Sequence, residues 1–218
     1  SDAALRANFN LAFGTAIPGA GTPVAADRKK IFDLAGDAAF NLANFVASLP
    51  NANLLLAALQ ADVTSRNNFN ALFGTAISVA APSAADFAVI FSVVAGAGYT
   101  QVSFLSVLAP AAGLLGALQA STSLRNNFNL LFGTALTAGV PTAASRGSLF
   151  DVAGDVAFDQ VSFLGVLPNA AGLLSALQSD AALRANFNLA FGTAILGGGT
   201  PVAADRKKIF DLAGDAAF

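Results

Sequence analysis

The chain has 218 residues, of which 55% are hydrophobic and 11% are charged, and its formal net charge is −2. This composition provides ample material for a core, but the net charge is too small to steer nucleic acid or an acidic substrate to the surface. The sequence contains no Cys and no His, which excludes disulfides, zinc sites, thiol nucleophiles and serine–histidine triads.

A twelve-residue motif, Leu-Arg-Asn-Asn-Phe-Asn-Leu-Leu-Phe-Gly-Thr-Ala from Leu124, occurs four times with small changes. The first Phe of the copies lies at Phe9, Phe69, Phe128 and Phe187, which indicates a regular internal repeat. In addition, residues 1–40 and 179–218 are identical at 38 of 40 positions. These periods predict a repeat protein: a 178-residue block of three units, followed by the first forty residues of the next block. Because the sequence also lacks Met, we expect it to be part of a longer chain.

Each unit is predicted to contain three helices. The expected units are a partial unit at 1–49, full units at 50–109 and 110–167, and the start of a new block at 168–218. The first helix is expected to follow Pro50, Pro110 or Pro168, because proline suits the first turn of a helix.

The second predicted helix is the repeated motif itself. Leu124, Phe128, Leu131 and Phe132 follow the spacing of an amphipathic helix. Gly133 lies inside this pattern, as does the glycine of every other copy. Glycine costs about 1 kcal/mol in a helix, so its recurrence predicts a close helix crossing or a kink.

The third predicted helix is long. Thr22 and Pro23 provide a capping residue and a first-turn proline, and an apolar stripe continues as far as Leu49. An unbroken helix of this kind would have about 25 residues and a length of roughly 37 Å, with a bend at Gly36. Taken together, the patterns predict an all-α fold of tandem three-helix repeats of about 59 residues, forming either an α-solenoid or fused helical bundles.

Two sets of polar residues are candidates for chemistry. Asp33 and Asp37 stand at i and i+4, as Asp151 and Asp155 do, and paired carboxylates can perform acid–base work or help to hold calcium. The middle unit has Ser92 and Gly96 at these positions, so a solvated helix face is the favoured interpretation.

Four arginines and four asparagine pairs recur at fixed positions. An arginine fork can capture phosphate or carboxylate, but hydrogen bonds to the carbonyls at helix C-termini are favoured here. The asparagine pairs are expected to form interhelix hydrogen bonds. We therefore predict no enzyme and no catalytic, cofactor-binding or metal site. The arginines are Arg6, Arg66, Arg125 and Arg184, and the asparagine pairs are Asn8/Asn10, Asn68/Asn70, Asn127/Asn129 and Asn186/Asn188.

The middle unit has Phe87 and Ala88 where the first unit has Arg28 and Lys29. We predict that its face of Phe87, Val89, Phe91 and Tyr99 is a self-association surface, covered by a neighbouring repeat or a second chain. Neither a nucleic-acid partner nor a membrane span is predicted, because lysine clusters are short and Gln101 and Pro110 are expected to interrupt the apolar runs.

The run from Leu59 to Gly74, Leu-Gln-Ala-Asp-Val-Thr-Ser-Arg-Asn-Asn-Phe-Asn-Ala-Leu-Phe-Gly, resembles helical repeat units of spider silk proteins of the egg-case and wrapping types. Those proteins also use an Ala-rich helix ending in Phe-Gly, avoid Cys, His, Met and Trp, and repeat long blocks in tandem. The resemblance covers this run and its counterparts in the other units. It implies secretion, assembly into fibres and no catalytic residues.

The expected function is that of a structural repeat segment in a secreted fibre- or material-forming polyprotein, which self-assembles through apolar helix faces. One alternative is an apolar-ligand-binding or surface-active helical protein. Another is a helical scaffold that binds a protein in its concave face.

Overall fold

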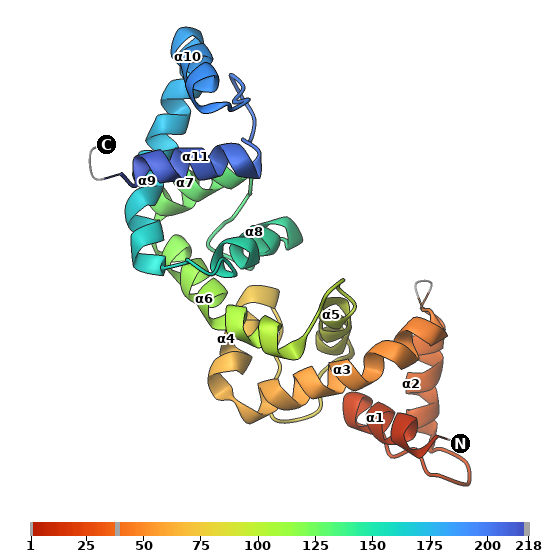
Figure 1. The fold of residues 1–218 in the computed structure, drawn as a ribbon. Coiled ribbons are helices and arrows are strands. Elements are labelled where there is room, and N and C mark those ends of the chain that lie inside the picture. Colours follow the sequence, from red (N-terminus) through yellow and green to blue (C-terminus); the bar gives the residue numbers. More distant parts are fainter. Residues whose placement is uncertain (1, 38–39, 216–218) are drawn as a thin grey trace. The chain divides into compact units, whose positions relative to one another are not determined.

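A computed structural model describes residues 2–37 and 40–215 (Figure 1). These residues form eleven α-helices and no β-strand, so the all-α prediction is confirmed. Two 11-residue helices and one 20-residue helix follow each other in a regular order. The short helices are α1 (Ala3–Phe13), α2 (Ala25–Ala35), α4 (Val63–Phe73), α5 (Ala84–Val94), α7 (Thr122–Phe132), α8 (Ala143–Ala153), α10 (Ala181–Phe191) and α11 (Ala203–Ala213), and the long ones are α3 (Leu42–Ala61), α6 (Gln101–Ala120) and α9 (Gln160–Ser179).

Helices at equivalent positions follow each other at the period of the repeated motif. We call α1, α4, α7 and α10 the first helices, α2, α5, α8 and α11 the middle helices, and α3, α6 and α9 the long helices. A repeat is one first, one middle and one long helix in chain order.

The first helices have well-defined ends. The Asp62 carboxylate accepts a hydrogen bond from the Ser65 amide at 2.7 Å and so caps α4. At the other end, Gly74 has a φ of +67° and its amide bonds to the Asn70 carbonyl, which is a left-handed helix cap that favours glycine. The prediction that these glycines lie inside a helix is therefore wrong, because each of them ends one.

The prediction of one long helix from Pro23 to Leu49 is also wrong, because two separate helices cover this range. The middle helix α2 ends at Ala35, and a new helix begins at Leu42, where the Asn41 side chain accepts a hydrogen bond from the Asn44 amide. Pro50 does not start a helix but lies inside α3. Because Pro50 is exposed, the carbonyl that it leaves without an intrahelical donor can bond to water instead.

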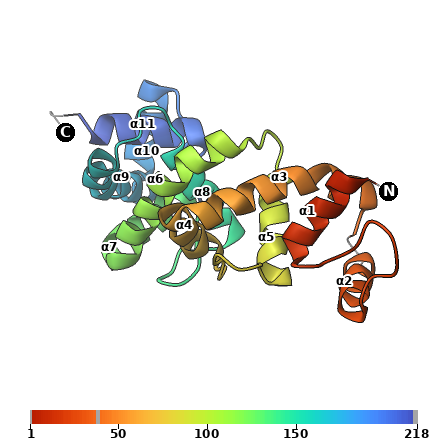
Figure 2. The ribbon, with the colours of Figure 1, turned by 90° about the horizontal axis from the view of Figure 1, so that it is seen from below.

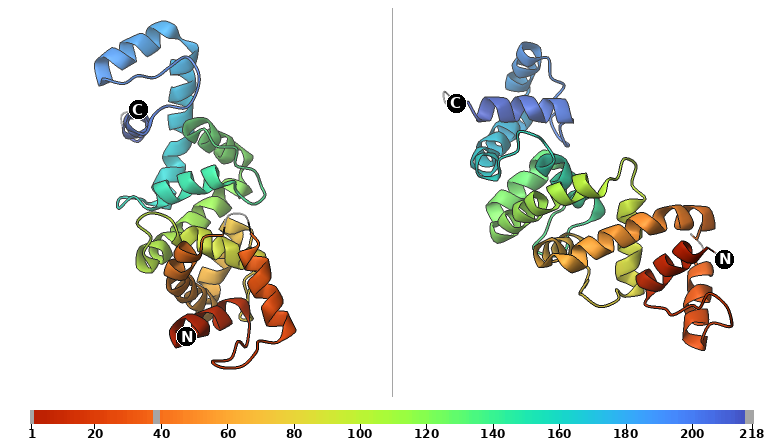
Figure 3. Two further views of the ribbon diagram at one scale, coloured as in Figure 1. Left: turned by 90° about the vertical axis from the view of Figure 1, so that its right-hand side faces the viewer. Right: turned by 60° about the horizontal axis from the view of Figure 1, so that its bottom comes forward.

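The chain divides into two compact units, Ser1–Ala109 and Pro110–Phe218, with the boundary inside α6. Within the first unit, α3 packs against α1, α4 and α5 (Figures 1 and 2). Within the second, α9 packs against α7, α10 and α11, and α11 crosses α9 (Figures 1 and 3). In each unit a long helix thus carries the core, and it contacts a middle helix from the following repeat.

The long helices are also long and apolar enough, by length and composition, to span a membrane. The prediction that Gln101 and Pro110 interrupt the apolar runs is wrong, since both lie within α6. Between 28% and 33% of each apolar stretch is buried within the chain. The absence of a membrane span therefore stays a prediction.

Candidate functional site

The paired acids lie on exposed surfaces. Asp33 forms an ion pair with Lys29 at 2.7 Å, and their side chains are 60% and 74% exposed. Asp211 and Lys207 form the same pair in α11, and hydrogen bonding to Asp211 raises the pKa of Lys207. Among the described residues, no three acidic side chains gather into a cluster that could hold a metal ion. Exposed i,i+4 ion pairs of this kind fit the solvated helix face.

The recurrent arginines join each long helix to the next first helix. Arg66 donates to the carbonyls of Leu59 and Gln60 at 3.3 and 2.9 Å, at the C-terminus of α3. Arg125 and Arg184 bind the ends of α6 and α9 in the same way. The predicted role of these three arginines is confirmed, and their forks are used within the fold.

The second asparagine of each pair braces a loop, so the prediction that it bonds between helices is wrong. Asn129 Oδ1 accepts from the Leu136 amide at 2.9 Å and from the Thr134 hydroxyl at 2.7 Å, and its Nδ2 donates to the Leu136 carbonyl. Asn10, Asn70 and Asn188 make the same three bonds. Each first helix is therefore tied to the loop that follows it.

A set of buried acids, which the sequence reasoning missed, completes this loop. Asp86 is 9% exposed; its carboxylate accepts from the Ala76 amide at 3.0 Å and from the Ser83 hydroxyl at 2.8 Å. Asp27 and Asp205 accept from the same loop in their repeats, and the buried Ser145 stands at the equivalent position of the third. The sequence does contain a signal for these acids, because three of the four repeats have an Asp at the third position of the middle helix.

Aromatic clusters lie where the middle helices α5 and α11 meet the preceding repeat. In the first unit, Phe91 of α5 stacks on Phe45 of α3 with ring centroids 5.0 Å apart, and Phe87 meets Phe13 of α1 edge to face at 4.9 Å. Offset and edge-to-face pairs stabilise a contact by about 0.5–1.5 kcal/mol beyond the buried area. The middle helix of the second repeat thus completes the core of the first.

The second unit repeats this arrangement. Phe210 of α11 stacks on Phe163 of α9 at 5.2 Å, as Phe91 does on Phe45. Arg206 takes the position of Phe87: its guanidinium lies 4.8 Å from the Phe132 ring and donates to the Pro201 carbonyl at 2.6 Å. Burial lowers the pKa of Arg206, and the nearby Asp151 carboxylate raises it.

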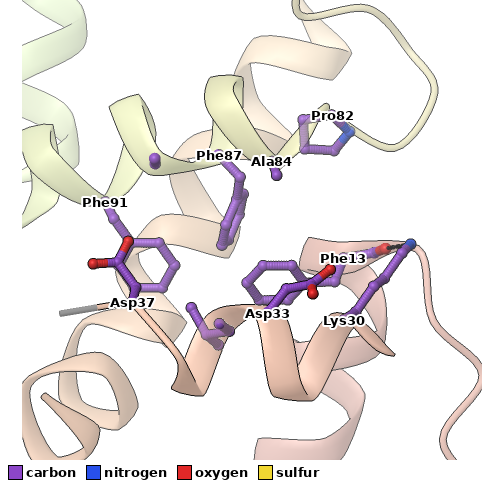
Figure 4. Close-up of a pocket in the computed structure, with 10 residues that line it drawn as sticks. Phe13, Lys30, Asp33, Asp37, Pro82, Ala84, Phe87 and Phe91 are labelled. Carbon is purple, nitrogen blue, oxygen red and sulfur yellow. Dashed lines mark hydrogen bonds between the residues drawn. The ribbon is translucent and has the colours of Figure 1, made fainter. Parts of the chain in front are cut away.

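Each unit contains a groove beside this contact. In the first, a cavity of about 260 Å³ lies between α2 and α5, with Phe13, Phe87 and Phe91 on its apolar side and Asp33 and Asp37 on the other (Figure 4). Lys30 closes one end of this groove, where its ammonium group donates to the Phe13 carbonyl (Figure 4). The groove is open and mixed in polarity.

The equivalent cavity of the second unit, about 590 Å³, lies between α8 and α11. Its α8 side carries Asp151 and Asp155, and its α11 side carries Arg206 and Lys207. The Asp155 carboxylate contributes to the raised pKa of Lys207. Opposite charges therefore face each other across this groove, whereas α5 brings no cation to the first one.

The residues of the predicted self-association face differ in how far they are buried within the chain. Phe87 is 1% exposed and Phe91 half-buried, because both pack on the first repeat. Val89 and Tyr99 are half-buried, and burial raises the pKa of the Tyr99 hydroxyl. Contact of this face with a second chain stays a prediction.

Comparison of the chain with protein-family models, curated proteins and solved structures found no match.

Proposed function

We propose that the chain is a structural repeat segment of a secreted fibre- or material-forming protein. The observation that carries this proposal is the set of aromatic contacts that two middle helices make with the preceding repeat: α5 packs on α1 and α3, and α11 packs on α7 and α9. A repeat built in this way cannot bury its apolar face alone and is completed by the next one. The resemblance of residues 59–74 to silk repeats supports secretion and a fibre as the product.

Contacts between successive long helices favour a solenoid over separate bundles. The Gln101 side chain at the start of α6 donates to the Leu54 carbonyl in the middle of α3. At the start of α9, the Gln160 side chain lies so close to Gly113 of α6 that an added Cβ would be 2.7 Å from its oxygen. Such nearest-neighbour contacts are typical of α-solenoids, whose stability grows with the number of repeats.

Assembly of the purified chain tests the proposed function. We expect light scattering and electron microscopy to show fibres above a threshold concentration or under shear, with helical circular dichroism retained. The variant Phe32→Asp/Phe191→Asp places charge on apolar side chains of the two terminal repeats, which are 74% and 40% exposed, and it should assemble less. The matched control is Val79→Asp/Leu196→Asp, at loop positions that are 75% and 71% exposed. A chain that stays monomeric under all these conditions contradicts the proposal.

A second candidate is a surface-active or apolar-ligand-binding helical protein. The specific observation in its favour is the set of three 20-residue apolar helices, of which only about a third is buried within the chain. Co-sedimentation with phosphatidylcholine vesicles and titration with a fluorescent fatty acid distinguish this second function from the fibre-forming one. Saturable binding at a defined stoichiometry, without polymerisation, favours this second function.

A further inference from the structure

Two identical helices of this chain have different surroundings. The middle helices α2 and α11 share the sequence Ala-Ala-Asp-Arg-Lys-Lys-Ile-Phe-Asp-Leu-Ala. In α11, Ile209 is fully buried and Ala213 is 4% exposed. In α2, the equivalent Ile31 is 38% exposed, and Ala35 is also exposed.

The other repeats establish which of the two states is usual. The position of Ile31 is occupied by Ile90 in α5 and Leu149 in α8, and both are fully buried. The phenyl ring that follows is half-buried in α5, α8 and α11, whereas Phe32 of α2 is 74% exposed. Three of the four middle helices are covered on this face, and α2 differs because no repeat precedes it in the structure.

We infer that the face of α2 formed by Ile31, Phe32 and Ala35 is a docking surface for a preceding repeat of the α7–α9 sequence in the same polypeptide. The partner is identified from the residues that surround α11. There, Phe163 stacks on Phe210, the ring equivalent to Phe32, and the Phe132 ring centroid lies 6.3 Å from that of Phe210. The inference rests on the proposed function, since it names the repeat that continues the array.

Charge distinguishes this partner from the other repeat that the chain offers. Around α11, Asp151 of α8 and Asp155, just after the end of α8, face Arg206 and Lys207. Helix α2 carries the same cations as Arg28 and Lys29. The α4–α6 repeat has Ser92 and Gly96 in place of those acids, so it can supply the apolar contacts but not the charges.

The test adds one repeat to the full chain. Residues 121–178 are duplicated directly ahead of Ser1, which recreates the natural step from Gln178 to Ser179. The control extension is residues 62–119, of equal length. Because the chain has no Cys, Ala35→Cys introduces a single thiol whose rate of alkylation by iodoacetamide reports on coverage. Ala213→Cys in the 218-residue chain gives the rate for a covered site.

We expect the 121–178 extension to slow alkylation of Ala35→Cys at least about tenfold, toward the rate of Ala213→Cys. The 62–119 extension should protect the thiol less at low salt, and the gap should shrink in about 0.5 M salt because screening weakens the charge contacts. A rate unchanged by the 121–178 extension overturns the inference, and so does equal protection by both extensions at low salt.

Three further outcomes are distinguishable. Below the threshold concentration for fibre assembly, protection of Ala35→Cys that depends on the concentration of the unextended chain would make a second copy the partner and overturn the inference. Protection in the extended chain without any fibre formation would leave the inference standing while the proposed function fails. Fibres in which the Ala35→Cys thiol stays exposed would overturn the inference while the proposed function stands.

Discussion

At the scale of single residues, different side chains perform the same task in different repeats. Phe87 and Arg206 occupy the same position of a middle helix, and each covers the second Phe in the first helix of the preceding repeat. An aromatic edge and a guanidinium plane both suit the face of a phenyl ring. The carbonyl that Arg206 binds, that of Pro201, has an equivalent at Pro82.

The substitution Phe87→Arg should therefore cost much less stability than Phe87→Ala. Alanine leaves a cavity against Phe13 and should lower the free energy of unfolding by about 3 kcal/mol. Arginine can stack on Phe13 and reach the Pro82 carbonyl, so we expect a loss of no more than about 1 kcal/mol. Urea denaturation followed by circular dichroism measures both, and equal losses would contradict the shared role.

Two capping glycines allow the cost of a strained backbone to be measured separately from the cost of a steric collision of an added side chain. Gly133 and Gly192 have φ angles of +62° and +63°, yet a Cβ on Gly133 would collide with the Thr200 side chain and one on Gly192 would meet open space. Gly192→Ala should cost about 1–2 kcal/mol, because alanine is strained in the left-handed region. Gly133→Ala should cost roughly 1–3 kcal/mol more, from overpacking. Thermal melts that rank the two variants in the opposite order would disprove this.

At the scale of helices, the capping residues fix where each element begins. Asp159 caps α9 by accepting from the Ser162 amide at 2.8 Å. Hydrogen bonding to Ser162 lowers the pKa of this carboxyl below its usual 3.8. A negative charge at a helix N-terminus is also favourable with respect to the helix dipole.

This cap predicts a pH dependence. Since the carboxyl has a lower pKa in the folded chain, its charge contributes stability above pH 3.8, and that contribution disappears as the pH falls through the folded pKa. Asn also caps helices well but does not titrate. The stability of the parent relative to Asp159→Asn should therefore be constant above about pH 5 and decline below 3.8. Urea melts from about pH 6 to about pH 2.5 check this, and a pH-independent difference would refute it.

The helices also show what the sequence could and could not predict. The first helices were found because their apolar stripe is regular and every copy repeats it. The pattern predicts the wrong helix ends around Gly36 and Pro50, because the glycine inside the apolar stripe ends α2 and the proline expected to begin a helix lies inside α3. Whether a proline faces solvent depends on tertiary packing, which a local pattern does not contain.

The same limit applies to the candidate site. The bonds of Arg66 to carbonyls were predictable because a basic side chain next to a helix C-terminus has few other acceptors. The buried Asp86 was missed because its donor is the amide of Ala76, in a loop that precedes the helix. Pairing between a helix and a separate loop follows from the fold and not from spacing along the chain.

At the scale of the whole molecule, the helices that pack into one core are not the three helices of one sequence repeat. A core consists of a first helix, its long helix and the middle helix of the following repeat. The terminal middle helix α2 therefore differs from its identical counterpart α11, although no residue within the two helices differs.

This arrangement predicts unequal effects of equal substitutions. Ile209→Ala removes a fully buried side chain and should cost about 2–4 kcal/mol, whereas Ile31→Ala removes one that is 38% exposed and should cost less than about 1 kcal/mol. Chemical denaturation of both variants provides the comparison. Equal costs would mean that the packing around α11 is not what stabilises it.

The sharing of one core between two repeats also has a consequence for biosynthesis. Phe13 leaves the ribosome more than one full repeat before Phe87, which is the ring that covers it. At roughly 5–20 residues per second, synthesis of the intervening chain lasts about 4–15 s. During that time each newly made repeat exposes phenyl rings, and exposed apolar surface makes incompletely folded chains prone to aggregate.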